Sequence, residues 1–123
     1  MINEWTNTLS TSFFLIIDII SRIRSKYLLF IMSLETTVFT FKISVPFEEW
    51  AAVYDSEENI QMNKERGIIC LYKGVKKDDP TSVILIEQGE EGKSIAMFED
   101  PAVKPLIESA GHIYDSTVIS SYS

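Results

Sequence analysis

Apolar and polar positions alternate along a ten-residue segment that begins at residue 36. From residue 36 to residue 45 the period is two, with Phe39, Phe41 and Ile43 on one side and hydroxyl or charged side chains on the other. Successive side chains of a β-strand point to opposite faces, so this pattern predicts a strand with one buried face. Pro46 ends the strand.

Helical spacing begins at this proline. Phe47, Trp50 and Tyr54 recur at intervals of three and four residues, which places them on one face of a helix. Proline is favourable in a first helical turn because its missing N–H would have no partner there. We therefore expect a helix over about residues 46–66, broken near its middle, with Gly67 as the C-terminal stop.

The remainder of the chain predicts three more strands and a second broken helix. In order, they are a strand at 68–75, a solvated loop at 76–82, a strand at 83–88, a turn at 89–92, a helix at 94–110 broken at Asp100–Pro101, and a strand at 112–122. The last strand is rich in Ser, Thr and Tyr, which is typical of a sheet edge.

This order of elements, βαββαβ, predicts a ferredoxin-like α+β fold. With right-handed crossovers, it forms a four-stranded antiparallel sheet with two helices on one face. Strands one and three lie in the centre of such a sheet, and strands two and four lie at its edges.

The third strand also predicts an oligomer. Its segment Val83–Ile86 is apolar at every position, so both faces of this central strand need cover. Two helices cover only one face of the sheet. The commonest cover for the other face is a second copy of the chain, so we expect a homodimer that packs through the sheet face.

Composition limits the possible partners and cofactors. The net charge of −7 argues against nucleic acid, because phosphate binding needs clustered Lys and Arg. The single cysteine, Cys70, excludes an intramolecular disulfide and fits a reducing, cytoplasmic location. With one His and one Cys, a zinc site of the usual type is not expected, and no motif indicates another metal or a cofactor.

Residues 1–33 differ abruptly from the rest. They contain no Gly, Ala, Pro or Val but seven Ile, whereas residues 34–123 carry a net charge of −8. A spanning helix needs roughly 20 apolar residues, and here Asp18 interrupts the run before Arg22 ends it. No membrane span and no secretory signal are therefore expected.

Three interpretations of this segment stay open. In the first, it forms an amphipathic helix on a membrane surface, and in the second, an extra helix that packs on the domain. In the third, the start codon is assigned too far upstream, so that A/T-rich DNA before a true start at Met32 is read as protein. We treat residues 1–33 as an N-terminal extension and residues 34–123 as the ferredoxin-like domain, and we assign no function to the extension.

Several segments resemble a known family. Val45–Trp50, Tyr72–Val75 followed by Asp78–Pro80, and Ser109–Tyr114 are similar to a family of short uncharacterised cyanobacterial proteins with the dimeric α+β barrel fold. The resemblance covers residues 34–123. It implies two ferredoxin-like subunits packed sheet against sheet, and it transfers no catalytic residues. The wider superfamily includes cofactor-independent monooxygenases, isomerases, haem-degrading enzymes and stress-responsive proteins, a weak guide to function.

Candidate site residues gather at one end of the predicted sheet. Antiparallel pairing places His112, at the start of the last strand, beside the end of the first strand and the helix that carries Trp50 and Tyr54. We predict these three as ligand-binding residues. The alternatives are that His112 is exposed after a helix cap and that the two aromatic residues are only core. Glu87 is either a partly buried carboxylate or, as we expect, a residue where the strand emerges into solvent.

Three classes of function are compatible with these residues. The first is a small-ligand-binding or regulatory module without turnover, which we favour because no strong acid–base pair is evident. The alternative is a cofactor-independent monooxygenase-like or isomerase-like enzyme acting on a small aromatic substrate, with His112 or Glu87 as base. A structural accessory of a larger complex is a third possibility.

Overall fold

The computed structural model of the chain describes residues 15–24, 26 and 33–123. It divides into two units, Met1–Ser33 and Leu34–Ser123, and each is described by itself.

Residues 15–24 of the first unit form a helix. Asp18 and Arg22 form an ion pair across one turn, with Nη2 and Oδ2 2.9 Å apart. Within the described residues, no helix is both long and apolar enough to cross a bilayer. Met32, on which one interpretation of the segment depends, lies outside the described residues.

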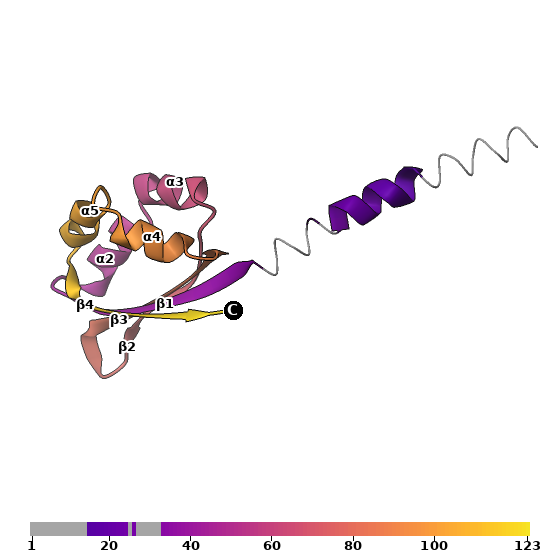
Figure 1. The fold of residues 1–123 in the computed structure, drawn as a ribbon. Coiled ribbons are helices and arrows are strands. Elements are labelled where there is room, and N and C mark those ends of the chain that lie inside the picture. Colours follow the sequence, from indigo (N-terminus) through magenta and orange to yellow (C-terminus); the bar gives the residue numbers. More distant parts are fainter. Residues whose placement is uncertain (1–14, 25, 27–32) are drawn as a thin grey trace, which may run out of the picture. The chain divides into compact units, whose positions relative to one another are not determined.

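The second unit contains the predicted four-stranded sheet. Its strands are β1 (Leu34–Ile43), β2 (Ile69–Lys76), β3 (Asp79–Glu90) and β4 (His112–Tyr122). Their order is β2-β3-β1-β4, and each neighbouring pair is antiparallel (Figure 1). The prediction of an α+β sheet with strands one and three in the centre is confirmed.

Each predicted helix consists of two short ones, and all four lie on one face of the sheet (Figure 1). They are α2 (Phe47–Tyr54), α3 (Glu57–Glu65), α4 (Lys93–Glu99) and α5 (Lys104–Ser109). The first break falls at Asp55–Ser56, where the Ser56 hydroxyl accepts a hydrogen bond from the N–H of Asn59 and starts α3. Gly67 and Gly111 have φ values of +68° and +90°, which suit glycine at a helix end.

The main core lies between β1, β3 and these helices. The alternating apolar residues of β1 that were predicted to be buried are each 3% exposed, as is Trp50. Val83 and Leu85 of β3 complete this cluster. The opposite side chains of β3, Ile84 and Ile86, face away from the helices and are only partly covered. We call this side of the sheet the open face.

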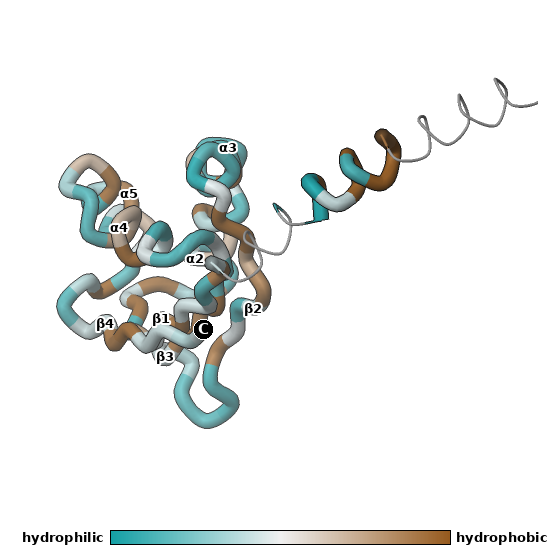
Figure 2. Tube along the Cα trace, turned by 45° about the vertical axis from the view of Figure 1, so that its right-hand side comes forward, coloured by the Kyte–Doolittle hydropathy of each residue, from teal (hydrophilic) through white to brown (hydrophobic). Residues whose placement is uncertain are grey.

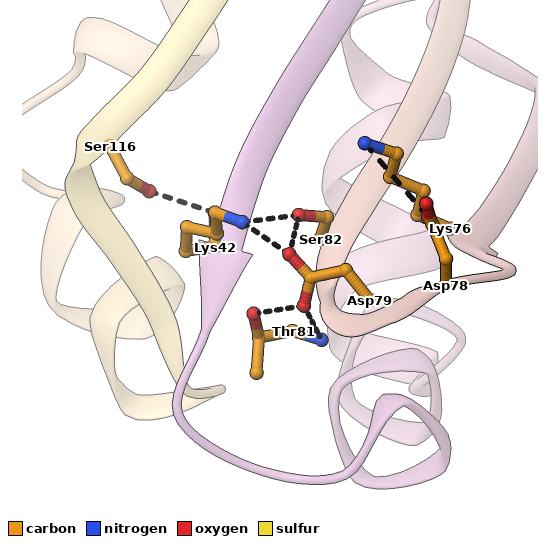
Figure 3. A network of polar contacts seen from close by, with 7 residues as sticks. All are labelled: Lys42, Lys76, Asp78, Asp79, Thr81, Ser82 and Ser116. Carbon is orange, nitrogen blue, oxygen red and sulfur yellow. Dashed lines mark hydrogen bonds and ion pairs between the residues drawn. The ribbon is translucent and has the colours of Figure 1, made fainter.

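The hairpin between β2 and β3 is tighter than predicted. We expected a loop at 76–82, but only Lys77 and Asp78 form the turn, at a hydrophilic tip (Figure 2). The pairing extends because the Lys42 ammonium of β1 donates to Asp79 Oδ2 at 2.6 Å and to Ser82 Oγ at 2.5 Å (Figure 3). Its hydrogen bond holds the pKa of the Asp79 carboxyl well below its usual range. Polar residues that look like a loop are thus fixed by a neighbouring strand.

A register shift in β2 interrupts the simple alternation of its side chains. Simple alternation would place Cys70 and Tyr72 on one face. The pairing instead shifts at Leu71, so that Cys70 lies opposite Glu87 on the helix side and Tyr72 lies opposite Ile86 on the open face. A β-bulge of this kind adds one residue to one strand and inverts the parity beyond it.

Candidate functional site

A cavity of about 80 Å³ lies between the sheet and the helices. Side chains from β1, β3 and β4 and from all four helices line it. Trp50, Tyr54 and His112 are all among these residues, so the structure places the three predicted site residues around one space. Their role as ligand contacts stays a prediction.

Four polar side chains on the wall of this cavity form what we call the polar cluster: Tyr54, Asn63, Glu87 and Ser94. The Tyr54 hydroxyl donates a hydrogen bond to Glu87 Oε2 at 2.5 Å, and Asn63 Nδ2 donates to the Tyr54 hydroxyl at 3.4 Å. The Asn59 amide lines the same wall and donates to the Tyr54 carbonyl oxygen at 2.6 Å, which ties the start of α3 to the end of α2.

Glu87 is buried, and our expectation that it emerges into solvent was wrong. Its side chain shares the parity of Val83 and Leu85, and the residue is only 6% exposed. Burial raises the pKa of its carboxyl, and the hydrogen bond from Tyr54 and the nearby Ser94 hydroxyl oppose that rise in part. Burial and the adjacent Glu87 also raise the pKa of the Tyr54 hydroxyl, so it stays a donor.

Two polar atoms of the cluster lack a partner. Among the described residues, Asn63 Oδ1 and Ser94 Oγ are the buried side-chain oxygens or nitrogens that make no hydrogen bond. Their residues are 8% and 4% exposed, and both line the cavity. An unsatisfied buried polar group costs about 1–3 kcal/mol, so these two atoms offer hydrogen-bonding positions to any molecule that enters the cavity, water included.

Aromatic rings line another part of the cavity. Trp50, Phe98 and His112 contribute to it, and Trp50 also stacks on Tyr54 with ring centres 5.4 Å apart. His112 is 7% exposed and stacks on Phe41 at 3.7 Å. The alternative in which His112 is an exposed residue after a helix cap therefore does not apply, while Trp50 is both core and cavity wall.

An irregularity in β4 holds the imidazole of His112. The pairing with β1 jumps between Ile113 and Val118, so that four residues of β4 bulge opposite Phe41. The bulge brings Thr117 close to His112, and Nε2 of His112 lies 2.7 Å from the Thr117 hydroxyl oxygen. That hydroxyl donates to the Tyr114 carbonyl, so it accepts from Nε2–H and leaves Nδ1 of neutral His112 without its proton. Burial lowers the pKa of His112 to about 4.

Glu87 and His112 occupy different ends of the cavity. Glu87 pairs with Thr37 of β1, and His112 pairs with Ile43. These β1 positions are six residues apart, which corresponds to about 20 Å along an extended strand. The two titratable groups are therefore too far apart to form an acid–base pair, as antiparallel pairing predicts.

The described residues contain no group of three or more His, Cys, Asp or Glu side chains placed to hold a metal ion. What the site offers is a buried acid with hydroxyl and amide neighbours, a neutral imidazole, and aromatic and aliphatic walls. A few polar groups set among apolar walls are also found in small-molecule pockets.

Solved structures share this fold. A variant of SnoaB, a cofactor-independent oxygenase from Streptomyces nogalater, superimposes with a TM-score of 0.54 at 13% identity, covering 74% of this chain and 92% of that one. A Shewanella oneidensis protein gives 0.49 at 15% identity, over 73% and 89% of the chains. A dimeric protein of unknown function and ferredoxin-like fold from Bacteroides fragilis gives 0.46 at 17% identity, over 74% and 96%.

A search among curated proteins found no match. The model of the family described as "Domain of unknown function (DUF3764)" matches residues 34–123. This range is most of the chain and contains the whole sheet, all four helices and the cavity. The chain therefore belongs to the DUF3764 family of domains of unknown function.

Proposed function

We propose that residues 34–123 form a small-ligand-binding module whose site is the cavity between the helices and the sheet, with Trp50, Tyr54 and His112 as contacts. One observation carries the proposal: Asn63 and Ser94 present unpartnered buried polar atoms on the cavity wall beside buried Glu87. Buried polar atoms in a fully packed core normally have hydrogen-bond partners, because an unpartnered one destabilises the fold.

The size of the cavity limits the ligand. At about 80 Å³ it is smaller than the roughly 150 Å³ engineered cavity that accepts benzene. The ligand, or the part of it that enters, therefore has only a few non-hydrogen atoms.

Filling the cavity tests the proposal. Ala110 is 7% exposed and lines the cavity, so Ala110→Leu should block binding of small fragments detected by chemical-shift changes at Trp50 and Tyr54 in NMR spectra of the full chain. Ala52, on the exposed side of α2, gives the matched control Ala52→Leu, which should bind as the parent does.

Because overpacking costs about 1–3 kcal/mol, the Ala110 variant needs a companion, and Val53→Phe fills the same space from α2. Fragments that bind the parent and both filled variants alike would place binding elsewhere and overturn the proposal.

A catalytic role on a small aromatic substrate is the second candidate, supported by the raised pKa of the buried Glu87 carboxyl beside aromatic walls. Only a substituent or an edge of such a substrate would enter a cavity of this size. An isomerase-like reaction would transfer a substrate C–H proton to Glu87 and return it to another carbon. A monooxygenase-like reaction would leave the deprotonated substrate to react with O₂, in line with the described activity of SnoaB. Turnover that is lost in Glu87→Gln would favour this role over binding alone.

We also propose the homodimer, with the domain in the cytoplasm. The open face carries Ile69, Tyr72, Val118 and Tyr122, which are 56–61% exposed, next to the partly covered Ile86. Large apolar side chains that stay this exposed on one side of a sheet are typical of an interface rather than of a solvated face. A second copy of the same face has matching apolar character.

Light scattering at micromolar concentration should give twice the mass of the chain. Tyr72→Glu places a charge on the open face and should shift the protein toward the monomer. Ile60→Glu makes a charge change of the same kind on α3, where Ile60 is 54% exposed, and should leave the mass unchanged. A monomeric parent protein would overturn the proposal.

A further inference from the structure

The polar cluster has more acceptors than donors. In the cluster, Tyr54 gives its one proton to Glu87, and Asn63 uses an N–H on Tyr54. Asn63 Oδ1 is left as an acceptor without a partner, the Glu87 carboxylate has lone pairs beyond the one that Tyr54 uses, and Ser94 Oγ has free lone pairs. A molecule that completes the cluster must therefore bring hydrogen-bond donors.

The charge of the cluster points the same way. Of the ion pairs formed by the described residues, none includes Glu87. The ammonium of Lys73 lies 5.7 Å from the ring centre of Tyr54, but it is paired with Asp55 at 3.0 Å. A buried carboxylate is costly unless a charge partner accompanies it.

From these two observations we infer that the ligand of this cavity is a small primary amine, or the amine-bearing end of a longer molecule, bound as its ammonium ion by Glu87, Asn63 and Ser94. An ammonium group offers three N–H donors on a compact charge, which matches the three acceptor groups. The apolar walls formed by Leu85, Met97 and Phe98 suit a short hydrocarbon body. This inference rests on the proposed function and specifies its ligand.

The inference predicts different affinities for three molecules of nearly the same shape: n-butylamine, 1-butanol and butyrate. We expect n-butylamine to bind the full chain near neutral pH about tenfold or more tightly than 1-butanol, since a charge-assisted hydrogen bond is worth appreciably more than a neutral one. Butyrate should not bind, because its carboxylate would meet Glu87. NMR titration that follows Trp50 and Tyr54 measures all three.

Glu87→Gln keeps the shape of the side chain and its bond from Tyr54 but removes the charge. In this variant, n-butylamine should lose its advantage over 1-butanol. Glu90→Gln, the same change at an exposed position of β3, should keep it. Should the Glu87 variant not fold, Ser94→Ala removes one acceptor and should reduce amine binding several-fold while sparing the alcohol.

The outcomes distinguish the inference from the proposed function. Equal binding of amine and alcohol at the cavity residues would overturn the ammonium inference and leave the ligand pocket standing. No shift at the cavity residues with any of the three, or with larger fragments, would overturn both. Preferential amine binding that Glu87→Gln does not change would place the cation elsewhere on this acidic protein and overturn the inference.

Discussion

Phe41→Ala should lower the free energy of unfolding by about 3–5 kcal/mol, the range found when a buried phenylalanine is truncated to alanine. Phe41 is 3% exposed at the centre of β1. Its ring stacks on His112 with ring centres 3.7 Å apart, and its centre lies 5.3 Å from that of the Trp50 ring. Truncation of Phe41 therefore removes packing contacts from two residues that line the cavity. For a domain with a stability of about 5–15 kcal/mol, this is a large fraction of the total.

Urea denaturation followed by circular dichroism measures the loss. Ile60→Ala on α3 is a suitable control, because Ile60 is 54% exposed and its truncation should change stability by less than about 0.5 kcal/mol. A loss below about 1 kcal/mol for Phe41→Ala would show that β1 does not carry the core as described.

The sidedness of the central strands could be predicted because it depends on local alternation. Phe39, Phe41 and Ile43 repeat every second residue, and the face they define is the buried one. The same rule contains the signal for Glu87, which continues the parity of Leu85 and is therefore inward. Our expectation of solvent gave weight to its charge and its place at the end of an apolar run rather than to this parity.

The irregularities of the edge strands could not be predicted in this way. The shift at Leu71 and the bulge before Val118 arise from pairing with a neighbouring strand, which alternation within one strand does not encode. The extended hairpin likewise depends on Lys42, which is distant in sequence from Asp79. Polar hydroxyl residues in the last strand hint at its bulge, because Thr117 bonds its own backbone three residues back.

The candidate site also combines residues that local patterns predict with residues that they do not. Trp50, Tyr54 and His112 could be selected because helix spacing and strand order bring them to one region. Asn63 and Ser94 could not, because a polar residue in a helix is usually exposed and only the closure of α3 and α4 over the sheet buries these two. The burial of these polar residues thus depends on tertiary packing, whereas the helices and strands that carry them follow from local sequence patterns.

The imidazole of His112 should titrate with a pKa of about 4, and this makes the fold sensitive to acid. Burial favours the neutral ring, so the folded state takes up the proton at lower pH than the unfolded chain, whose histidine has a pKa near 6.5. The unfolded state therefore binds more protons as the pH falls from about 6.5 to about 4, and stability is lost across that window. The difference between these two pKa values corresponds to a loss of at most about 3 kcal/mol in the free energy of unfolding.

Other groups around the ring do not change this sign. His112 faces the rings of Phe41, Phe98 and Tyr114 and the Thr117 hydroxyl, and no acidic or basic side chain is among these contacts. Glu87 acts in the opposite sense, because its raised pKa means that its contribution to stability is lost as the pH rises. Comparing the parent with His112→Gln at each pH removes the contribution of Glu87 from the difference.

Because His112 is the only histidine of the chain, its imidazole resonances report one group in an NMR titration. Gln61→His adds an exposed histidine on α3 as an internal control, and that ring should titrate near 6.5 in the same sample. The loss of unfolding free energy on acidification should also be smaller in His112→Gln than in the parent protein. If both imidazoles titrate together near 6.5, the ring of His112 faces solvent, and it is then no part of the cavity wall.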